Sequence, residues 1–287
     1  MNTEPRVRDE TITLDGLRLH YRDWGDPAAP PVVLLHAHGQ NARSWDTIAQ
    51  GLADRFRVLA LDQRGHGESE HATNYHELRL VGDLAEFADA LGLARFAAVG
   101  FSISASTAVS YALLYPDRVE RLVLFEGFTE GDEVGEAPWI AEMRAHLAVL
   151  RALPMVVATP EEAAVAFRPL APHAEEAELV RWVRGGLRQA PDGQWTSRAD
   201  AIFRQPPTAP GRLNAPPAVL RDRLAQIQCP ALLVVGEDSW MVEPTEQFAT
   251  VNPDVSVVRI PQAGHWIPLD NPSGFLEVVS PFLQGDA

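Results

Sequence analysis

One string of residues constrains the fold of this chain more than any other feature of the sequence. It is a short apolar run that ends in a glycine and continues, after one serine, into small residues. The string is Phe96-Ala97-Ala98-Val99-Gly100-Phe101-Ser102-Ile103-Ser104-Ala105-Ser106. The apolar run predicts a buried strand and the small residues predict a helix, so Ser102 falls at the apex of a sharp strand–turn–helix connection. Such a turn strains the serine backbone and requires small residues two positions to either side. Gly100 meets this requirement fully, and Ser104 meets it in part.

Apolar runs and helical patterns alternate along most of the chain. Runs bounded by turn signals predict strands over 11–14, 17–22, 31–35, 58–61, 96–99, 121–125, 231–235 and 255–260. The first two would form a hairpin around Asp15-Gly16. Helical periodicity predicts helices over 81–91 and 103–114. This alternation predicts an α/β fold with a mostly parallel sheet and helices on both faces.

The region from 129 to 222 interrupts the alternation. It contains no pattern typical of a buried strand, and its proline-rich part, 205–217, predicts irregular structure. Helical patterns cover 139–153, 160–167 and 174–187. We therefore predict a core domain made of residues 1–128 and 223–287, with residues 129–222 inserted as a helical cap.

The composition of the chain indicates which binding partners and which cellular location to expect. The 287 residues are 46% hydrophobic, enough to bury the core of one α/β domain with an insertion. A net charge of −15, spread along the chain, argues against nucleic acid and anionic membranes as partners. We find no signal-peptide pattern in residues 1–10 and no apolar run of membrane-spanning length, so we expect a cytoplasmic protein. A homodimer is compatible with the sequence, which does not indicate an oligomeric state.

The chain has a single cysteine. Cys229 therefore cannot form an intramolecular disulfide, and its place before Pro230 at the start of an apolar run predicts a buried structural thiol.

Three further motifs accompany the serine turn in a fixed order. They are Leu34-Leu35-His36-Ala37-His38-Gly39 with Trp45 downstream, Asp62-Gln63-Arg64-Gly65-His66-Gly67-Glu68-Ser69, and Ala263-Gly264-His265-Trp266. Together with the serine turn they resemble the motifs of the α/β-hydrolase fold superfamily over nearly the whole chain. The resemblance implies a mostly parallel eight-stranded sheet with helices on both faces and an inserted helical cap.

The motifs also suggest the chemistry. A serine hydroxyl is a poor nucleophile at neutral pH, so Ser102 needs a base, and an imidazole such as His265 has an ordinary pKa near working pH. The resemblance implies an oxyanion hole formed by the backbone amides of His38 and Ile103. One such donor typically stabilises the transition state by about 3 kcal/mol.

Two carboxylates compete as the acid that would orient His265. The family usually supplies it from a Gly-x-x-Asp turn after the seventh strand, but here Ser239 occupies that place and Asp238 stands one residue early. The sixth predicted strand ends in Glu126. Some members take their acid from that strand end, including haloalkane dehalogenases and the fungal lactonases that open zearalenone. We therefore favour Glu126 over Asp238 as the partner of His265.

Aromatic residues near these motifs are candidate pocket walls. The resemblance implies that Phe101 lines the pocket floor. Trp182 in the predicted cap, and Trp240 and Trp266 beside the site loops, either contact substrate or pack in the core.

No metal is expected at the first motif. His36 and His38 are alternate residues at a strand end, so their side chains should point apart, and no carboxylate or cysteine completes a ligand set. No cofactor is implied either.

These residues predict a serine hydrolase that cleaves a carboxylic ester or lactone of a small to medium apolar substrate through an acyl-enzyme. A serine, rather than an aspartate, at position 102 argues against haloalkane dehalogenase and epoxide hydrolase chemistry. The strings Ser102-Ile103-Ser104-Ala105-Ser106-Thr107 and Tyr115-Pro116-Asp117-Arg118-Val119, with Glu126, are similar to zearalenone-type lactonases. Two alternatives stay open: carbon–carbon bond hydrolysis on the same triad, and a hydrolase-like ligand receptor or signalling protein with slow turnover.

Overall fold

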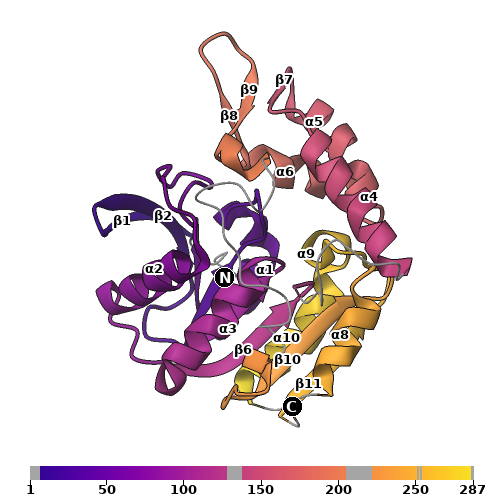
Figure 1. Cartoon of the computed structure of the whole chain (residues 1–287). Coiled ribbons are helices and arrows are strands. Elements are labelled where there is room, and N and C mark those ends of the chain that lie inside the picture. The colour runs from indigo at the N-terminus through magenta and orange to yellow at the C-terminus, as the bar shows by residue number, and fades with distance from the viewer. Residues whose placement is uncertain (1–6, 128–137, 205–221, 251, 253, 286–287) are drawn as a thin grey trace.

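An eight-stranded sheet forms the centre of the protein (Figure 1). The computed structural model describes residues 7–127, 138–204, 222–250, 252 and 254–285. In spatial order the strands are β1 (Arg8–Leu14), β2 (Leu17–Trp24), β4 (Arg57–Leu61), β3 (Pro31–Leu35), β5 (Phe96–Phe101), β6 (Val119–Phe125), β10 (Ala231–Gly236) and β11 (Val255–Ile260). The pairs β1–β2 and β2–β4 are antiparallel and the others are parallel, which confirms the predicted mostly parallel sheet.

The opening hairpin forms at the predicted place. Asp15 and Gly16 have φ of +47° and +75°, and Leu14 pairs with Leu17, as in a two-residue turn of the mirror-image type that suits twisted strands. Strand β1 begins three residues before the predicted start at Thr11. Its first residues are charged and mostly exposed, so an apolar pattern could not reveal them.

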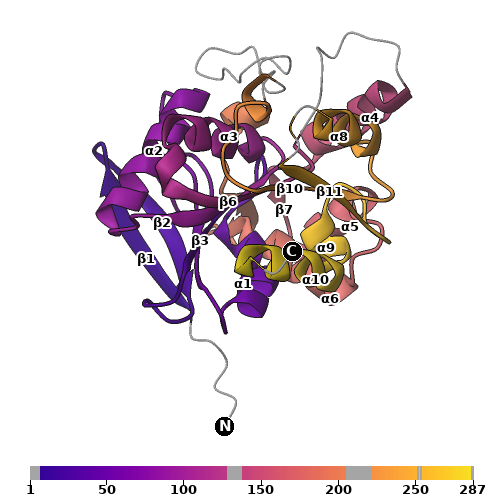
Figure 2. The ribbon, with the colours of Figure 1, turned by 90° about the horizontal axis from the view of Figure 1, so that it is seen from below.

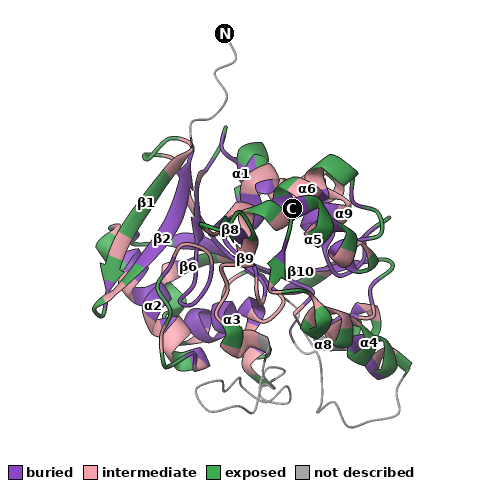
Figure 3. Ribbon diagram, turned by 90° about the horizontal axis from the view of Figure 1, so that it is seen from above, coloured by how far each residue is buried: buried purple, intermediate pink, exposed green. Residues whose placement is uncertain are grey.

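Helices cover both faces of the sheet (Figure 2). On one face lie α2 (Glu77–Ala90), α3 (Ser104–Leu114) and α8 (Val242–Ala249), and on the other lie α1 (Asp46–Leu52) and α10 (Pro272–Gln284). Phe87 and Tyr111 are buried in the first core, and Ile48 and Phe275 in the second. All residues of β5 and β10 are buried, which explains their continuous apolar sequences. Figure 3 shows the contrast within the sheet between β2, which is mostly buried, and the edge strand β1, which is mostly exposed.

Residues 138–204 lie outside the main sheet and are called the inserted segment. Its helices are α4 (Pro138–Ala152), α5 (Pro160–Phe167) and α6 (Glu176–Gly185). A small antiparallel sheet joins β7 (Val156–Val157), β9 (Trp195–Ser197) and β8 (Leu187–Gln189), and these elements lie together on one side of the main sheet (Figure 1).

The inserted segment corrects one helix boundary. The first two helices agree with prediction, but α6 is shorter than the predicted 174–187, and Leu187 begins a strand. The segment also contains short strands that are mostly exposed or half-buried, which the sequence did not indicate because strands of two or three residues are too short to show an alternating pattern. The predicted irregular stretch 205–217 lies outside the described residues.

The described residues include no helix that is both long enough and apolar enough to cross a membrane. Cys229 is partly rather than fully buried. Burial raises the pKa of its thiol to about 11, so the group stays protonated and unreactive at neutral pH.

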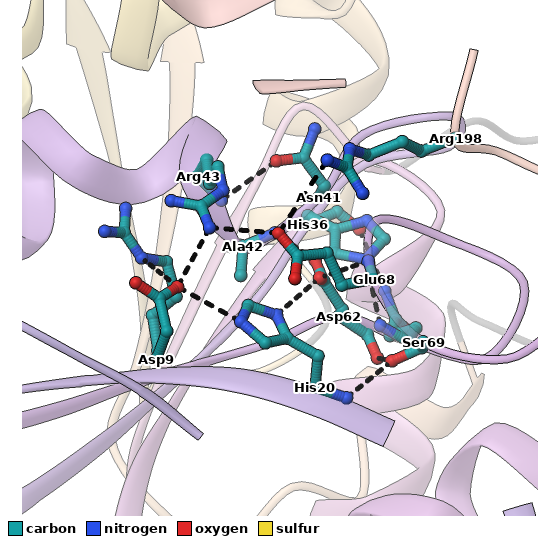
Figure 4. Close-up of polar contacts among 12 residues, drawn as sticks. Asp9, His20, His36, Asn41, Ala42, Arg43, Asp62, Glu68, Ser69 and Arg198 are labelled. Atoms are coloured by element: carbon teal, nitrogen blue, oxygen red, sulfur yellow. Dashed lines mark hydrogen bonds and ion pairs between the residues drawn. The ribbon is translucent and has the colours of Figure 1, made fainter. Parts of the chain in front are cut away.

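An ionic cluster around the buried pair His20 and Asp62 ties β2 to two neighbouring loops (Figure 4). The Nδ1 atom of His20 lies 2.7 Å from Oδ2 of Asp62, and its Nε2 atom lies 3.1 Å from Oδ1 of Asp9. Asp62 also accepts hydrogen bonds from the backbone N–H groups of Glu68, at 2.8 Å, and Ala42. One carboxylate thus fixes the loops after β3 and β4, the first of which carries His38.

Protonation of His20 strengthens this cluster. Burial opposes the charge, but the hydrogen bond and charge of Asp62 outweigh it and raise the pKa of His20 above its ordinary value of 6.5. A raised pKa in the folded state stabilises the protein fully below the unfolded pKa. The stabilisation is lost as the pH rises through the folded pKa.

We predict that Asp62→Ala lowers the free energy of unfolding by about 3 kcal/mol near pH 6, because it leaves His20 and two backbone donors without their acceptor. Urea denaturation measures the loss, which should shrink as the pH rises through the raised pKa of His20. Asp54→Ala, at an exposed position, is the matched control and should change stability by less than about 0.5 kcal/mol. Equal effects of the two substitutions would contradict the prediction.

Candidate active site

Ser102 occupies the turn between β5 and α3 in a strained conformation. Its φ is +54°, in the left-handed region, and its N–H donates to the carbonyl of Phe125 on β6 at 2.9 Å. A Cβ atom at Gly100 would lie 2.7 Å from the carbonyl oxygen of Ser104 and 3.0 Å from Cα of Ala105. Both contacts are with backbone, so only glycine fits two residues before Ser102.

Ser104 links the start of α3 to the loop after β3. Its Oγ donates to the carbonyl of His36 at 2.6 Å and accepts from Nε2 of Gln63 at 2.8 Å. The Nε2 group of Gln63 also donates to the carbonyl of His36 at 3.1 Å. Ser104 is buried, so these bonds satisfy a hydroxyl that water does not reach. This serine therefore holds the loop that carries His38 against the turn that carries Ser102.

Glu126 lies at the end of β6 and contacts His265. Its Oε2 atom is 2.9 Å from Nδ1 of His265 and accepts from Oγ of Ser239 at 2.6 Å, while its Oε1 atom accepts from the N–H of Gly236 at 2.7 Å. The backbone N–H of Gly236 can only donate, and Oγ of Ser239 accepts from the N–H of Met241 at 3.1 Å while it donates to Oε2. When Glu126 is ionised, Nδ1 of His265 is the donor to its Oε2 atom, and Nε2 of His265 is left as a lone-pair base.

Burial acts in opposite directions on the two groups. It raises the pKa of the Glu126 carboxyl, and the hydrogen bonds from Ser239 and Gly236 oppose that shift. It lowers the pKa of the His265 imidazole, which favours the neutral form that can accept a proton. Burial therefore disfavours the charged form of each group, and the hydrogen bonds from Ser239 and Gly236 favour the ionised form of Glu126.

Asp238, the competing carboxylate, contacts a different histidine. Its Oδ2 atom lies 2.9 Å from Nε2 of His173 in the inserted segment, and both side chains are exposed. The structure thus brings Glu126, and not Asp238, to His265. Ser239 stands where an aspartate is usual and donates to Glu126.

The two histidines of the loop after β3 have separate partners. His36 has Nδ1 2.8 Å from the carbonyl of Ala37, and its Nε2 accepts from the N–H of Gln63 at 3.1 Å. His38 has Nε2 2.8 Å from the carbonyl of Phe203 in the inserted segment. Within the described part of the chain, no cluster of three or more histidine, cysteine or acidic side chains could hold a metal.

A cavity of about 30 Å³ lies beside this loop. His38, Ile103, His66 and Phe203 are among the residues that line it. The rings of His66 and Phe203 stack with centroids 4.0 Å apart. The structure therefore brings the two residues expected to supply oxyanion amides to one small cavity, closed on one side by the inserted segment.

Aromatic rings surround His265. Trp240 stacks on it with ring centroids 5.5 Å apart and an interplanar angle of 15°, and Phe101 lies at 5.5 Å. Trp266 meets it edge-on at 5.3 Å. Phe101 precedes Ser102, so these contacts place the His265 ring next to the turn that carries the serine.

Trp182 is not among the aromatic residues described above as packing on His265. It packs on Trp266 at 5.3 Å and donates from Nε1 to the carbonyl of Ser44 at 3.3 Å. Trp182, Trp266 and Phe101 line a second cavity of only about 10 Å³. Trp182 and Trp266 are almost fully buried, so packing accounts for most of their contacts.

One residue at this site carries no signal in the sequence. His146 of α4 places its ring centroid 4.9 Å from that of His265 and 6.1 Å from those of Trp240 and Trp266. Its surroundings in the sequence predict only a helix, and no motif or spacing links it to the loops of the core.

Comparison with known proteins agrees with this architecture. The family model of the α/β hydrolase fold matches residues 30–150. A Bacillus subtilis protein named "Putative 2-succinyl-6-hydroxy-2,4-cyclohexadiene-1-carboxylate synthase" is 32% identical over 281 residues, covering 94% of this chain and 96% of that protein. An esterase of Mycobacterium tuberculosis is 31% identical over 271 residues, covering 91% of this chain and 85% of that protein. The chain therefore belongs to the α/β hydrolase fold family.

A solved structure extends the likeness to the whole fold. The crystal structure of E-2-(acetamidomethylene)succinate hydrolase superposes with a TM-score of 0.82 at 21% identity, covering 97% of this chain and 100% of that one. At this identity the likeness concerns the fold alone, and it agrees with the eight-stranded sheet described above.

We predict that Ser104→Ala lowers the free energy of unfolding by about 1–3 kcal/mol, because the carbonyl of His36 and the amide of Gln63 lose a buried partner. Chemical denaturation measures the change. Ser106→Ala is the matched control on the same helix, since its Oγ bonds only the nearby carbonyl of Ile103 at 3.0 Å, and it should cost less than Ser104→Ala. If both variants were as stable as the parent, Ser104 would have no role in fixing the loop.

Proposed function

We propose that this protein is a serine hydrolase of the esterase or lactonase type. The observation that carries the proposal is the 2.9 Å contact between Glu126 and His265, beside the strained turn of Ser102. A buried carboxylate on Nδ1 fixes the tautomer in which Nε2 accepts a proton. An esterase among the relatives supports the reaction class.

In this mechanism Ser102 attacks the carbonyl carbon of the substrate while Nε2 of His265 takes the hydroxyl proton. The negative oxygen of the tetrahedral intermediate accepts hydrogen bonds from the backbone amides of His38 and Ile103. Glu126 stabilises the imidazolium, which then protonates the leaving alkoxide. A water molecule that gives a proton to His265 attacks the acyl-enzyme, and the acid leaves as Ser102 is protonated again. The proposal needs no cofactor.

The substrate class follows from the walls of the site. Trp240 is half-buried and stacks on His265, and the buried rings of Phe101 and Trp266 pack around it, so the setting of His265 suits an apolar ester or lactone of small to medium size. We propose that residues 129–222 form the cap over this site. The contact from His38 to Phe203 supports this arrangement. Both cavities are much smaller than an ester or lactone substrate, so the proposal includes movement of the surrounding side chains or of the cap on substrate binding.

A fluorophosphonate probe tests the nucleophile. We expect the parent protein to be labelled covalently at Ser102, because in the proposed mechanism His265 activates this hydroxyl. Ser102→Ala should not be labelled, and Ser106→Ala should be labelled as the parent is. Intact-protein mass spectrometry measures the adduct. An unlabelled parent would refute the hydrolase proposal.

The choice of acid has its own test. Glu126→Gln should lower kcat for p-nitrophenyl acetate by roughly 10³–10⁴-fold, because the amide no longer stabilises the imidazolium and can favour the wrong tautomer. Asp238→Asn, which removes a carboxylate held by His173, should keep kcat within about threefold. Steady-state kinetics on the folded variants measures both. Near-normal turnover of Glu126→Gln with loss in Asp238→Asn would reverse the assignment.

A further inference from the structure

The Nε2 atom of His146 is buried and has no hydrogen-bond partner among the described residues. The same holds for Nε1 of Trp240 and Nε1 of Trp266, whose ring centroids each lie 6.1 Å from that of His146. A buried polar group without a partner costs about 1–3 kcal/mol, so protein folding alone gives no reason to gather three of them around one site. All three rings contact His265, whose role in the proposed reaction requires it to meet the substrate.

The ring of His146 is neutral at this position. Burial and the neighbouring His265 lower its pKa to about 3, so the imidazole carries no charge at neutral pH. A neutral imidazole offers one N–H donor and one lone pair, and the indole of Trp240 offers one N–H donor. Around these groups lie the rings of Trp266 and His265.

We infer that His146 and Trp240 form a polar subsite that binds an uncharged hydrogen-bonding group of the substrate, a carbonyl or a hydroxyl, close to the bond that is cleaved. This inference rests on the proposed function. The short distance between the rings of His146 and His265, 4.9 Å, limits the separation of that group from the reacting carbonyl to a few bonds. An uncharged group fits better than a carboxylate, because aromatic surroundings penalise a charge more than a dipole.

This subsite makes His146 a specificity-determining residue. Its position on α4 means that the inserted segment, and not only the core, would select the substrate. A purely structural role predicts something different. If His146 only filled space, a ring of similar size without nitrogen would serve equally well, and the affinities of polar and apolar esters would change together.

The experiment compares three short esters in a Ser102→Ala background, where they bind without being hydrolysed. Ethyl acetoacetate and ethyl 3-hydroxybutyrate carry a carbonyl or hydroxyl on the acyl chain, and ethyl butyrate carries neither. Ligand-observed NMR titration gives the three dissociation constants. The preference is the dissociation constant of ethyl butyrate divided by that of a polar ester. In the double variant Ser102→Ala/His146→Phe this ratio should fall by about fivefold for either polar ester, the effect of one neutral hydrogen bond.

Two further variants separate hydrogen bonding from packing. His146→Gln keeps a donor and an acceptor and should restore most of the preference. His173→Phe, which alters the other histidine of the inserted segment, should leave it unchanged. A preference that survives His146→Phe, or no binding of any of the three esters, would overturn the inference. The two proposals can also fail separately. If His146→Phe removes the preference for polar esters but the parent protein hydrolyses none of the esters in a Ser102-dependent way, the subsite is supported and the hydrolase proposal is refuted.

Discussion

The carboxylate of Glu126 is the interaction on which the arrangement of the site depends. It accepts hydrogen bonds from Gly236 at the end of β10 and from Ser239 in the loop that follows, and it contacts His265 in the loop after β11. Three segments that follow neighbouring parallel strands therefore converge on one buried group. Because a buried carboxylate is costly unless its oxygens are satisfied, these donors hold the charge and position the imidazole at the same time.

The register of β5 and β6 explains why the serine and the carboxylate lie side by side. Phe101 pairs with Phe125, and the two rings stack with centroids 4.4 Å apart. The residue after each, Ser102 or Glu126, has φ between +53° and +54°. In both residues the N–H donates to a carbonyl of the next strand, at 2.9 and 3.2 Å. The sheet thus stabilises two strained residues in the same way: each follows the last residue of a strand and donates its N–H to the neighbouring strand.

The sequence was enough to predict the sheet and the position of Ser102, because buried parallel strands are continuous apolar runs and the turn has a strict requirement for glycine at position 100. The contact of Glu126 with His265 was anticipated from a resemblance, through the missing aspartate at 239. Local patterns could not predict the contacts of Ser104 or His146. Each depends on a partner from another segment, His36 in one case and His265 in the other. The strands of the inserted segment escaped prediction because they are too short to carry a period.

Because the carboxylate that contacts His265 follows β6, the loop after β10 does not have to supply it. Ser239 needs only to donate a hydrogen bond, so its neighbour Asp238 is available to contact His173 of the inserted segment. The backbone N–H of His173 in turn donates to Asp270, which accepts from Gly264, the residue before His265. The loop after β10 and Asp270, at the end of α9 (Ile267–Asp270), therefore contact both the inserted segment and the segment that carries His265. A displacement of the inserted segment would alter contacts within one residue of His265, which links access to the site with the geometry of its base.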